Sequence, residues 1–126
     1  MTPDDLARVS IDDRPDVRVV SLTGEIDASN ADEVRDRVIG GLPNSALGIV
    51  ADLSGLSYLD SAGIALVFEV ADRLGRRGQA LALVLPAESL IRRALEVTQV
   101  DTLVPLESTR DAAIDRIRAA DGEATA

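Results

Sequence analysis

The sequence predicts an α/β domain with a mixed, mostly parallel sheet of four to five strands and about four helices. Residues 46–53 and 80–85 are near-continuous apolar runs, as expected for strands that are covered on both faces. Segments with helical spacing of apolar residues separate and follow these runs. Residues 6–11 and 17–23 read as strands joined by the turn signal Arg14-Pro15-Asp16, which predicts an antiparallel hairpin at the amino-terminal edge.

A first helix is predicted to begin near Asn30, because Asn30 stands three residues before Glu33, the spacing of a capping box. Two glycines and a proline at positions 40, 41 and 43 end this helix. After the strand at residues 46–53, residues 54–60 are predicted to form a polar loop. This loop leads into a second helix over about residues 62–77.

The last third of the chain predicts two more helices and an edge strand. Pro86 suits the first turn of a third helix that runs to about Thr98. Residues 102–106 are predicted as a short edge strand, and Ser108 with Asp111 as the cap of a last helix. The order β-β-α-β-α-β-α-β-α makes a single domain of residues 1–126, with about 6–120 ordered and residues 1–5 and 121–126 as flexible tails.

The composition excludes several classes of function. The net charge of −9 disfavours nucleic acid and anionic membrane surfaces as partners. Histidine, cysteine and lysine are absent, which rules out a Ser-His triad, a Cys-His pair, a Schiff base and the usual nitrogen and sulfur ligands of zinc. We therefore predict a protein that is not an enzyme and that needs no cofactor or metal. The lack of cysteine, of a membrane-length apolar run and of a leader-like amino terminus predicts a cytoplasmic location.

Functional groups in such sheets gather in the loops after the carboxyl ends of parallel strands. Residues 24–30 and 54–63 are two such loops, and the chain direction brings both to the same end of the sheet. Ser61 lies at or beside the N-cap of the second helix, and one interpretation is that its hydroxyl is displayed there to receive a phosphoryl group, which a helix N-terminus tolerates well. The alternative is that Ser61, or Asp60, simply caps the helix, an effect worth about 1 kcal/mol.

Two further features near Ser61 have open interpretations. Glu25 and Asp27 place two carboxylates on one short segment, either for chemistry or as solvated loop groups. Leu66 and Val70 are predicted to stand off the core stripe of the second helix and to form a docking edge, or else to belong to a broad buried face. The predicted core stripe consists of Ile64, Val67, Phe68, Ala71 and Leu74.

Residues 23–27 (Thr-Gly-Glu-Ile-Asp) and 52–63 (Asp-Leu-Ser-Gly-Leu-Ser-Tyr-Leu-Asp-Ser-Ala-Gly) resemble the motifs of the anti-sigma-factor antagonists, members of the STAS domain superfamily. The order of elements resembles this family over nearly the whole chain. The resemblance implies a STAS-like fold. It also implies a protein-binding switch in transcription regulation, as in stress responses, that works by partner switching.

The resemblance implies two protein partners. The unphosphorylated form would bind an anti-sigma factor, which has a histidine-kinase-like ATP-binding fold and serine kinase activity, and thereby release a sigma factor. The kinase would phosphorylate Ser61 and abolish binding, and a metal-dependent protein phosphatase would reset the switch. Asp27 matches an acidic residue that helps the kinase to engage, and Ala62 replaces a second serine of many relatives. The predicted partner-binding residues are Glu25, Asp27, Asp60, Ala62, Gly63, Leu66 and Val70.

Other classes of protein fit less well. A receiver domain needs a lysine that this chain lacks, and a carboxylate-driven hydrolase would rest on Glu25, Asp27 and Asp60 without any sign of a substrate pocket. The alternative that remains is a STAS-type interaction subunit of a lipid transporter or a stressosome, without a phosphorylation switch. The chain is expected to be a monomer or a weak dimer.

Overall fold

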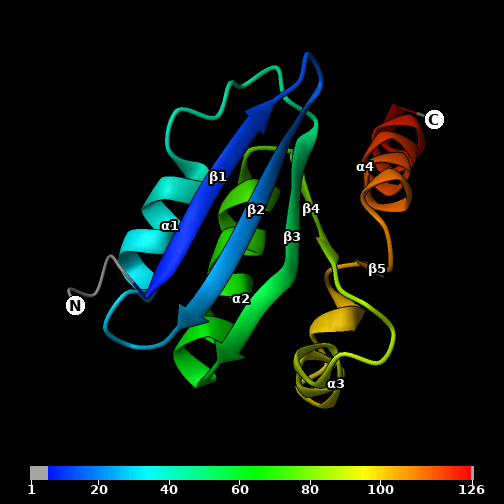
Figure 1. The fold of residues 1–126 in the computed structure, drawn as a ribbon. Helices are drawn as coiled ribbons and strands as arrows, with labels where there is room; N and C mark the ends of the chain where they lie inside the picture. Colours follow the sequence, from blue (N-terminus) through cyan, green and yellow to red (C-terminus); the bar gives the residue numbers. More distant parts are fainter. Residues whose placement is uncertain (1–5, 126) are drawn as a thin grey trace.

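The computed structural model describes the backbone of residues 6–125 and the side chains of residues 6–121. The predicted order of strands and helices is confirmed (Figure 1). The elements are β1 (Ala7–Asp13), β2 (Val17–Ile26), α1 (Ala31–Ile39), β3 (Gly48–Leu59), α2 (Ser61–Arg76), β4 (Ala80–Val84), α3 (Leu90–Val97), the 3₁₀ helix η2 (Val100–Thr102), β5 (Leu106–Glu107) and α4 (Arg110–Thr125). The tail predicted for residues 1–5 lies outside the described residues, as does residue 126. Residues 121–125 continue α4, so the tail predicted to start at residue 121 is helical there.

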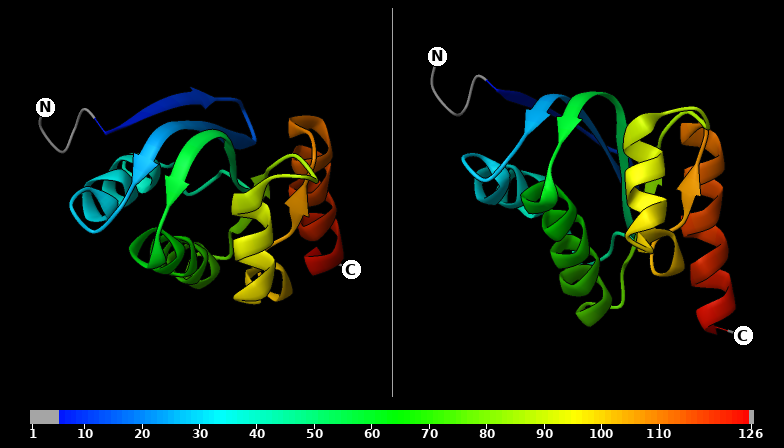
Figure 2. Two further views of the ribbon diagram at one scale, coloured as in Figure 1. Left: turned by 60° about the horizontal axis from the view of Figure 1, so that its bottom comes forward. Right: turned by 90° about the horizontal axis from the view of Figure 1, so that it is seen from below.

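The strands form one mixed sheet in the order β1-β2-β3-β4-β5. β1 is antiparallel to β2 and the other neighbours are parallel, as predicted. One face packs against α1, α2 and α3 through the main core, which includes Ile49, Leu74 and Leu95. α4 covers part of the opposite face, where Ile114 and Ile117 pack in a second cluster (Figure 2). The central strands are therefore covered on both faces, which explains their continuous apolar runs.

The predicted loop at residues 54–60 is wrong, because β3 continues as a strand to Leu59. This part of β3 pairs with β2, with partners such as Thr23 and Gly55, and the register shifts twice along it. In this part of β3, Leu56 is buried while Ser57 and Tyr58 are exposed. Its polar residues therefore face solvent from a strand and do not indicate a turn.

Three helix starts differ from the prediction. Asn30 precedes α1 but its side chain makes no capping hydrogen bond, so the predicted capping box is absent. α3 begins at Leu90 and not at Pro86, and Ser89 caps it by accepting a hydrogen bond from the Arg92 N–H. For α4, Thr109 and not Ser108 accepts the capping hydrogen bond, from the Ala112 N–H at 3.1 Å.

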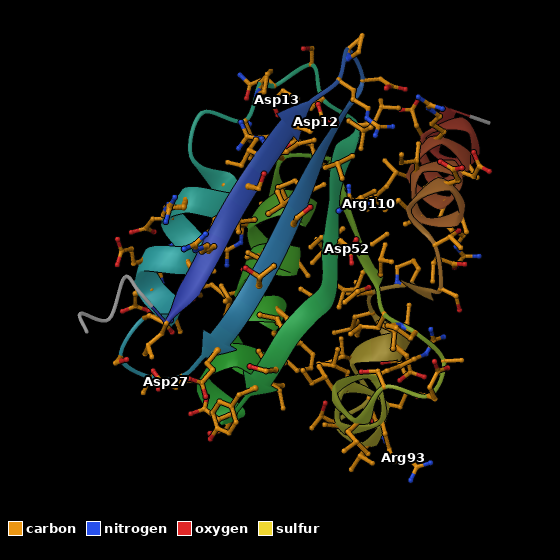
Figure 3. The ribbon with its side chains drawn as sticks, in the orientation of Figure 1. Asp12, Asp13, Asp27, Asp52, Arg93 and Arg110 are labelled. Atoms are coloured by element: carbon orange, nitrogen blue, oxygen red, sulfur yellow. The ribbon has the colours of Figure 1, made fainter. Side chains whose placement is uncertain are left out.

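The carboxyl-terminal edge of the sheet also differs in detail. The edge strand predicted at residues 102–106 is the two-residue strand β5, which pairs with Leu83 and Val84 of β4. Val100–Thr102 instead forms η2. Nearby, Arg110 donates hydrogen bonds to Asp52 Oδ2 at 2.7 Å and to Ser21 Oγ at 2.6 Å, which joins the start of α4 to the sheet (Figure 3).

A buried arginine joins α1 to the amino-terminal hairpin. Arg18 on β2 is 3% exposed and pairs with Asp13 at 2.7 Å. Its guanidinium also donates to the carbonyl oxygens of Val38 and Gly40 at the end of α1, at 3.0 and 2.8 Å. The hydrogen bond from Arg18 lowers the pKa of the Asp13 carboxyl group. These contacts satisfy carbonyl groups that the helix end leaves without intrahelical partners.

Candidate functional site

β2 and β3 end side by side, and this brings the two predicted loops together. Ile26 pairs with Leu59, the last residues of the two strands. The Asp60 N–H donates to the Ile26 carbonyl oxygen at 3.3 Å. Asp27 and Asp60 therefore leave the sheet at the same edge, and Figure 3 shows Asp27 at the end of β2. We call this end of the sheet, where Asp27, Asp60 and Ser61 follow the last residues of β2 and β3, the serine edge.

Ser61 is the first residue of α2, and its neighbour Asp60 is the N-cap. Asp60 Oδ1 accepts hydrogen bonds from the Ala62 N–H at 2.9 Å and from the Gly63 N–H at 3.2 Å. Ser61 is exposed, and its hydroxyl forms no hydrogen bond with any other residue in the described part of the chain. Capping is thus the role of Asp60, and the Ser61 hydroxyl is left open to solvent.

The first turn of α2 packs tightly on the ends of the two strands. Gly63 is buried, and a Cβ atom there would lie 2.2 Å from Leu59 Cδ1 and 3.3 Å from Ile26 Cγ2. A larger residue at this position would force the Leu59 side chain to move. Ala62 is half-buried. Gly63, predicted as a partner contact, is instead a packing residue that holds the serine next to the sheet.

The loop after β2 holds Asp27 in an ionised form. Asp27 Oδ1 accepts hydrogen bonds from both the N–H and the hydroxyl of Ser29, and these bonds lower the pKa of the Asp27 carboxyl group. Asn30 is 3% exposed and fixes the backbone of the loop. Its Nδ2 donates to the Glu25 carbonyl oxygen and its Oδ1 accepts from the Asp27 N–H, both at 2.9 Å. Asn30 is a positioning residue that the capping-box interpretation missed.

Replacement of Asn30 by alanine is expected to destabilise the domain by about 1–3 kcal/mol, because two part-buried backbone groups lose their partners. The matched control is Asn44→Ala, since Asn44 is exposed, and that variant should change stability by less than about 0.5 kcal/mol. Urea denaturation followed by circular dichroism measures both. Equal stabilities of the two variants would show that the Asn30 bonds contribute nothing.

Of the two interpretations of Leu66 and Val70, the docking edge is wrong and the buried face is confirmed. Leu66 and Val70 are 7% and 4% exposed and belong to the main core. The buried stripe of α2 is rotated from the predicted one and consists of Gly63, Leu66, Val67, Val70 and Leu74. Ile64, Phe68 and Ala71 are only half-buried. Because most positions from 62 to 74 are apolar, spacing alone does not identify the centre of the buried face.

Two exposed apolar side chains on β3 and α3 were not predicted from the sequence. Tyr58 is 47% exposed near the end of β3. β4 is parallel to β3 but ends opposite Asp52, and the chain then enters α3 at Leu90, which is 80% exposed. Leu90 does not share the helix face of Ile91 and Leu95, which points inward. This difference in helical position could have predicted from the sequence that Leu90 is exposed.

The serine edge is acidic. Glu25 is exposed, and Asp27 and Asp60 are half-buried. Within the described part of the chain, none of these three carboxylates forms an ion pair with an arginine. A partner with basic groups would therefore meet unpaired negative charge here.

Two kinds of feature are absent from the residues that the structure describes. No group of three or more His, Cys, Asp or Glu side chains is arranged to hold a metal ion. None of the helices has both the length and the apolar character that a bilayer crossing requires.

The mixed five-stranded sheet with its antiparallel first strand, together with the four α-helices of the described residues, is the fold of a STAS domain. The STAS domain family model matches residues 8–113, and the chain belongs to this family.

The relatives of this chain within the family include anti-sigma factor antagonists. The chain is 26% identical to the anti-sigma-F factor antagonist RsfB of Mycobacterium tuberculosis over 119 residues, which are 94% of this chain and 95% of RsfB. An anti-sigma factor antagonist from Mycobacterium paratuberculosis has a similar crystal structure, with a TM-score of 0.78, 27% identity and coverage of 94% of this chain and 99% of that one. The antagonist SpoIIAA in its unphosphorylated form shares the fold, with a TM-score of 0.69, 21% identity and coverage of 89% and 97%.

Proposed function

We propose that this chain is an anti-sigma-factor antagonist that acts in the cytoplasm as a phosphorylation-controlled switch. Its unphosphorylated form binds an anti-sigma factor with serine kinase activity and thereby frees a sigma factor. Phosphorylation of Ser61 ends this binding. The observation that carries the proposal is the exposed Ser61 hydroxyl, which stands unbonded at the first position of α2 while Asp60 caps the helix. The relatives named as antagonists support the same function.

The surroundings of Ser61 suit a residue that is modified without damage to the fold. The start of α2 carries the positive end of the helix dipole, which favours a phosphate. The hydroxyl has no partner to lose within the described chain, and the Asp60 cap does not depend on it. A phosphoserine adds about −1.5 to −2 charges at neutral pH. The fold therefore persists while the charge of the serine edge changes sharply.

The chemistry in this proposal belongs to the partners. The Ser61 oxygen attacks the γ-phosphorus of ATP bound to the kinase, the bond from that phosphorus to ADP breaks, and a base on the kinase takes the hydroxyl proton. Asp27 is the acidic contact that helps the kinase to engage. A metal-dependent phosphatase then hydrolyses the phosphoserine and restores the hydroxyl. The chain itself supplies an acceptor and a docking surface and is not an enzyme.

The docking surface consists of residues of the serine edge that reach solvent, together with Leu90 at the start of α3. Glu25, Asp27 and Asp60 supply its charge. Tyr58 and Leu90 take the place of Leu66 and Val70 as its apolar contacts, because an exposed side chain can bury area against a partner without unfolding the domain.

The test is incubation with the cognate anti-sigma kinase, ATP and magnesium, followed by mass spectrometry of peptides. One phosphate is expected, on Ser61, and none on the Ser61→Ala variant. The matched control is Ser57→Ala, which removes another exposed serine near the same edge and should be modified as the original chain is. If phosphate appeared at another residue, or if none appeared, the result would contradict a switch that is controlled by phosphorylation of Ser61. That result would instead favour an interaction subunit of a lipid transporter or a stressosome.

A further inference from the structure

β1 is an edge strand whose outer side has no neighbour among the described strands. It stands first in the sheet order and pairs only with β2. Figures 1 and 2 show it at the margin of the sheet. An uncovered edge presents unpaired backbone N–H and C=O groups, which form a template for pairing with another strand.

The register with β2 shows which backbone groups point outward. The Leu6 carbonyl accepts from the Glu25 N–H at one end of the hairpin, and the Arg14 N–H donates to the Val17 carbonyl at the other. The backbone N–H and C=O groups of the even-numbered residues of β1 thus point toward β2. The backbone groups of Val9 and Ile11 point outward, away from β2. Ile11 is also 42% exposed, which is unusual for a large apolar residue in a sheet.

The sequence of β1 is self-complementary about Ser10. In an antiparallel pair of two copies with the two-fold axis at Ser10, Arg8 lies opposite Asp12 of the second copy, and Val9 opposite Ile11 of the second copy. The outward-facing Val9 and Ile11 then exchange backbone hydrogen bonds, as the antiparallel pattern requires. We propose that β1 binds β1 of a second copy of this chain in this register, so that the two five-stranded sheets become one continuous sheet.

Charge selects this register over its neighbours. Arg8 forms no ion pair within the described part of the chain, and Asp12 pairs only with Arg14, at 3.3 Å in an exposed position. Figure 3 shows Asp12 near the end of β1. A shift of the two-fold axis to Ile11 would place Arg8 opposite Arg14, and a shift to Val9 would leave Arg8 opposite Ser10. Of these three axes, only the one at Ser10 gives two Arg–Asp pairs.

The dimer is weak and leaves the serine edge open. Its area is that of a single seven-residue strand pair, whereas stable interfaces bury about 1,200–2,000 Å² in total. The net charge of −9 on each copy adds repulsion. We expect dissociation constants of about 0.1–1 mM.

Ser61 follows β3, two strands inward from β1, so the dimer does not depend on the function proposed above.

Disulfide trapping tests the register directly, because the chain has no cysteine. Ser10→Cys places two thiols opposite each other on the axis, within the Cα separation of about 4.4–6.8 Å that disulfides need. Mild oxidation should trap a covalent dimer of this variant. Thr23→Cys is the matched control, since Thr23 is also exposed but lies on β2 and should give little dimer. Equal trapping of the two variants would overturn the proposal.

Charge exchange provides a second test by sedimentation velocity. Arg8→Asp alone and Asp12→Arg alone should each raise the dissociation constant by about tenfold, because each turns two attractive pairs into repulsive ones. The double variant restores opposite charges and should return the constant to within about twofold of the original chain. A chain that stays monomeric at about 1 mM, or a dimer that ignores these charges, would overturn the proposal.

Discussion

Phosphorylation of Ser61 is expected to weaken binding to the anti-sigma partner by about 10³- to 10⁴-fold. The dianion would have to lose water at the interface, which costs several kcal/mol unless a partner charge compensates it. Asp27 and Asp60 leave the sheet at the same edge and add like-charge repulsion. Titration calorimetry with the unmodified chain and with a chain shown by mass spectrometry to carry the phosphate measures this ratio.

The variants of Ser61 separate the charge effect from the loss of the hydroxyl. Ser61→Ala should bind the partner with at least half of the original affinity and should not respond to ATP. Ser61→Glu should fall between the two forms, because one carboxylate carries less charge than a phosphate. The melting temperatures of all forms should agree within a few degrees, since Asp60 caps the helix in each. A phosphorylated chain that binds as tightly as the unmodified one would exclude the switch.

Leu66→Asp is expected to destabilise the domain by about 4 kcal/mol or more, because it places a carboxylate without a partner in the main core. Domains of this kind are stable by about 5–15 kcal/mol in total. The variant should therefore be largely unfolded, or unfold at much lower urea concentration. Circular dichroism during urea titration measures the shift. A variant as stable as the original chain would mean that the Leu66 side chain reaches solvent.

Leu90→Asp is the matched variant, with the same chemical change at a residue that is 80% exposed. Leu90 begins α3, where a carboxylate interacts favourably with the helix dipole, so stability should change by less than about 0.5 kcal/mol. If Leu90 contacts the partner as proposed, affinity should fall about tenfold. Unchanged affinity in this folded variant would remove Leu90 from the docking surface and leave the proposal for Ser61 intact.

The position of the phosphorylation candidate was predictable because it depends on local rules. A buried apolar run, a polar segment and a helical pattern place Ser61 at the start of a helix near the carboxyl end of a strand. Parallel strand direction then predicts that Asp27 and Asp60 share one edge, and the pairing of Ile26 with Leu59 agrees with this. Local order along the chain was enough for both conclusions.

Residue roles that depend on three-dimensional neighbours were not predictable. Asn30 has the spacing of a capping residue, but tertiary contacts direct its amide to the backbone of Glu25 and Asp27. Asp60 and Ser61 are both suitable caps by type, and only the folded structure shows that Asp60 reaches the helix N–H groups.

By itself, the sequence determined the class of the fold, the order of its elements and the place of Ser61, because hydrophobic periodicity and turn chemistry are properties of neighbouring residues. The tertiary structure decided which side of α2 faces the core, how far β3 extends and which apolar groups stay exposed. Most positions of α2 from residue 62 to residue 71 are apolar, so several rotations satisfy the same pattern. Only the contacts with the sheet and the neighbouring helices select one rotation, and that selection buries Leu66 and Val70.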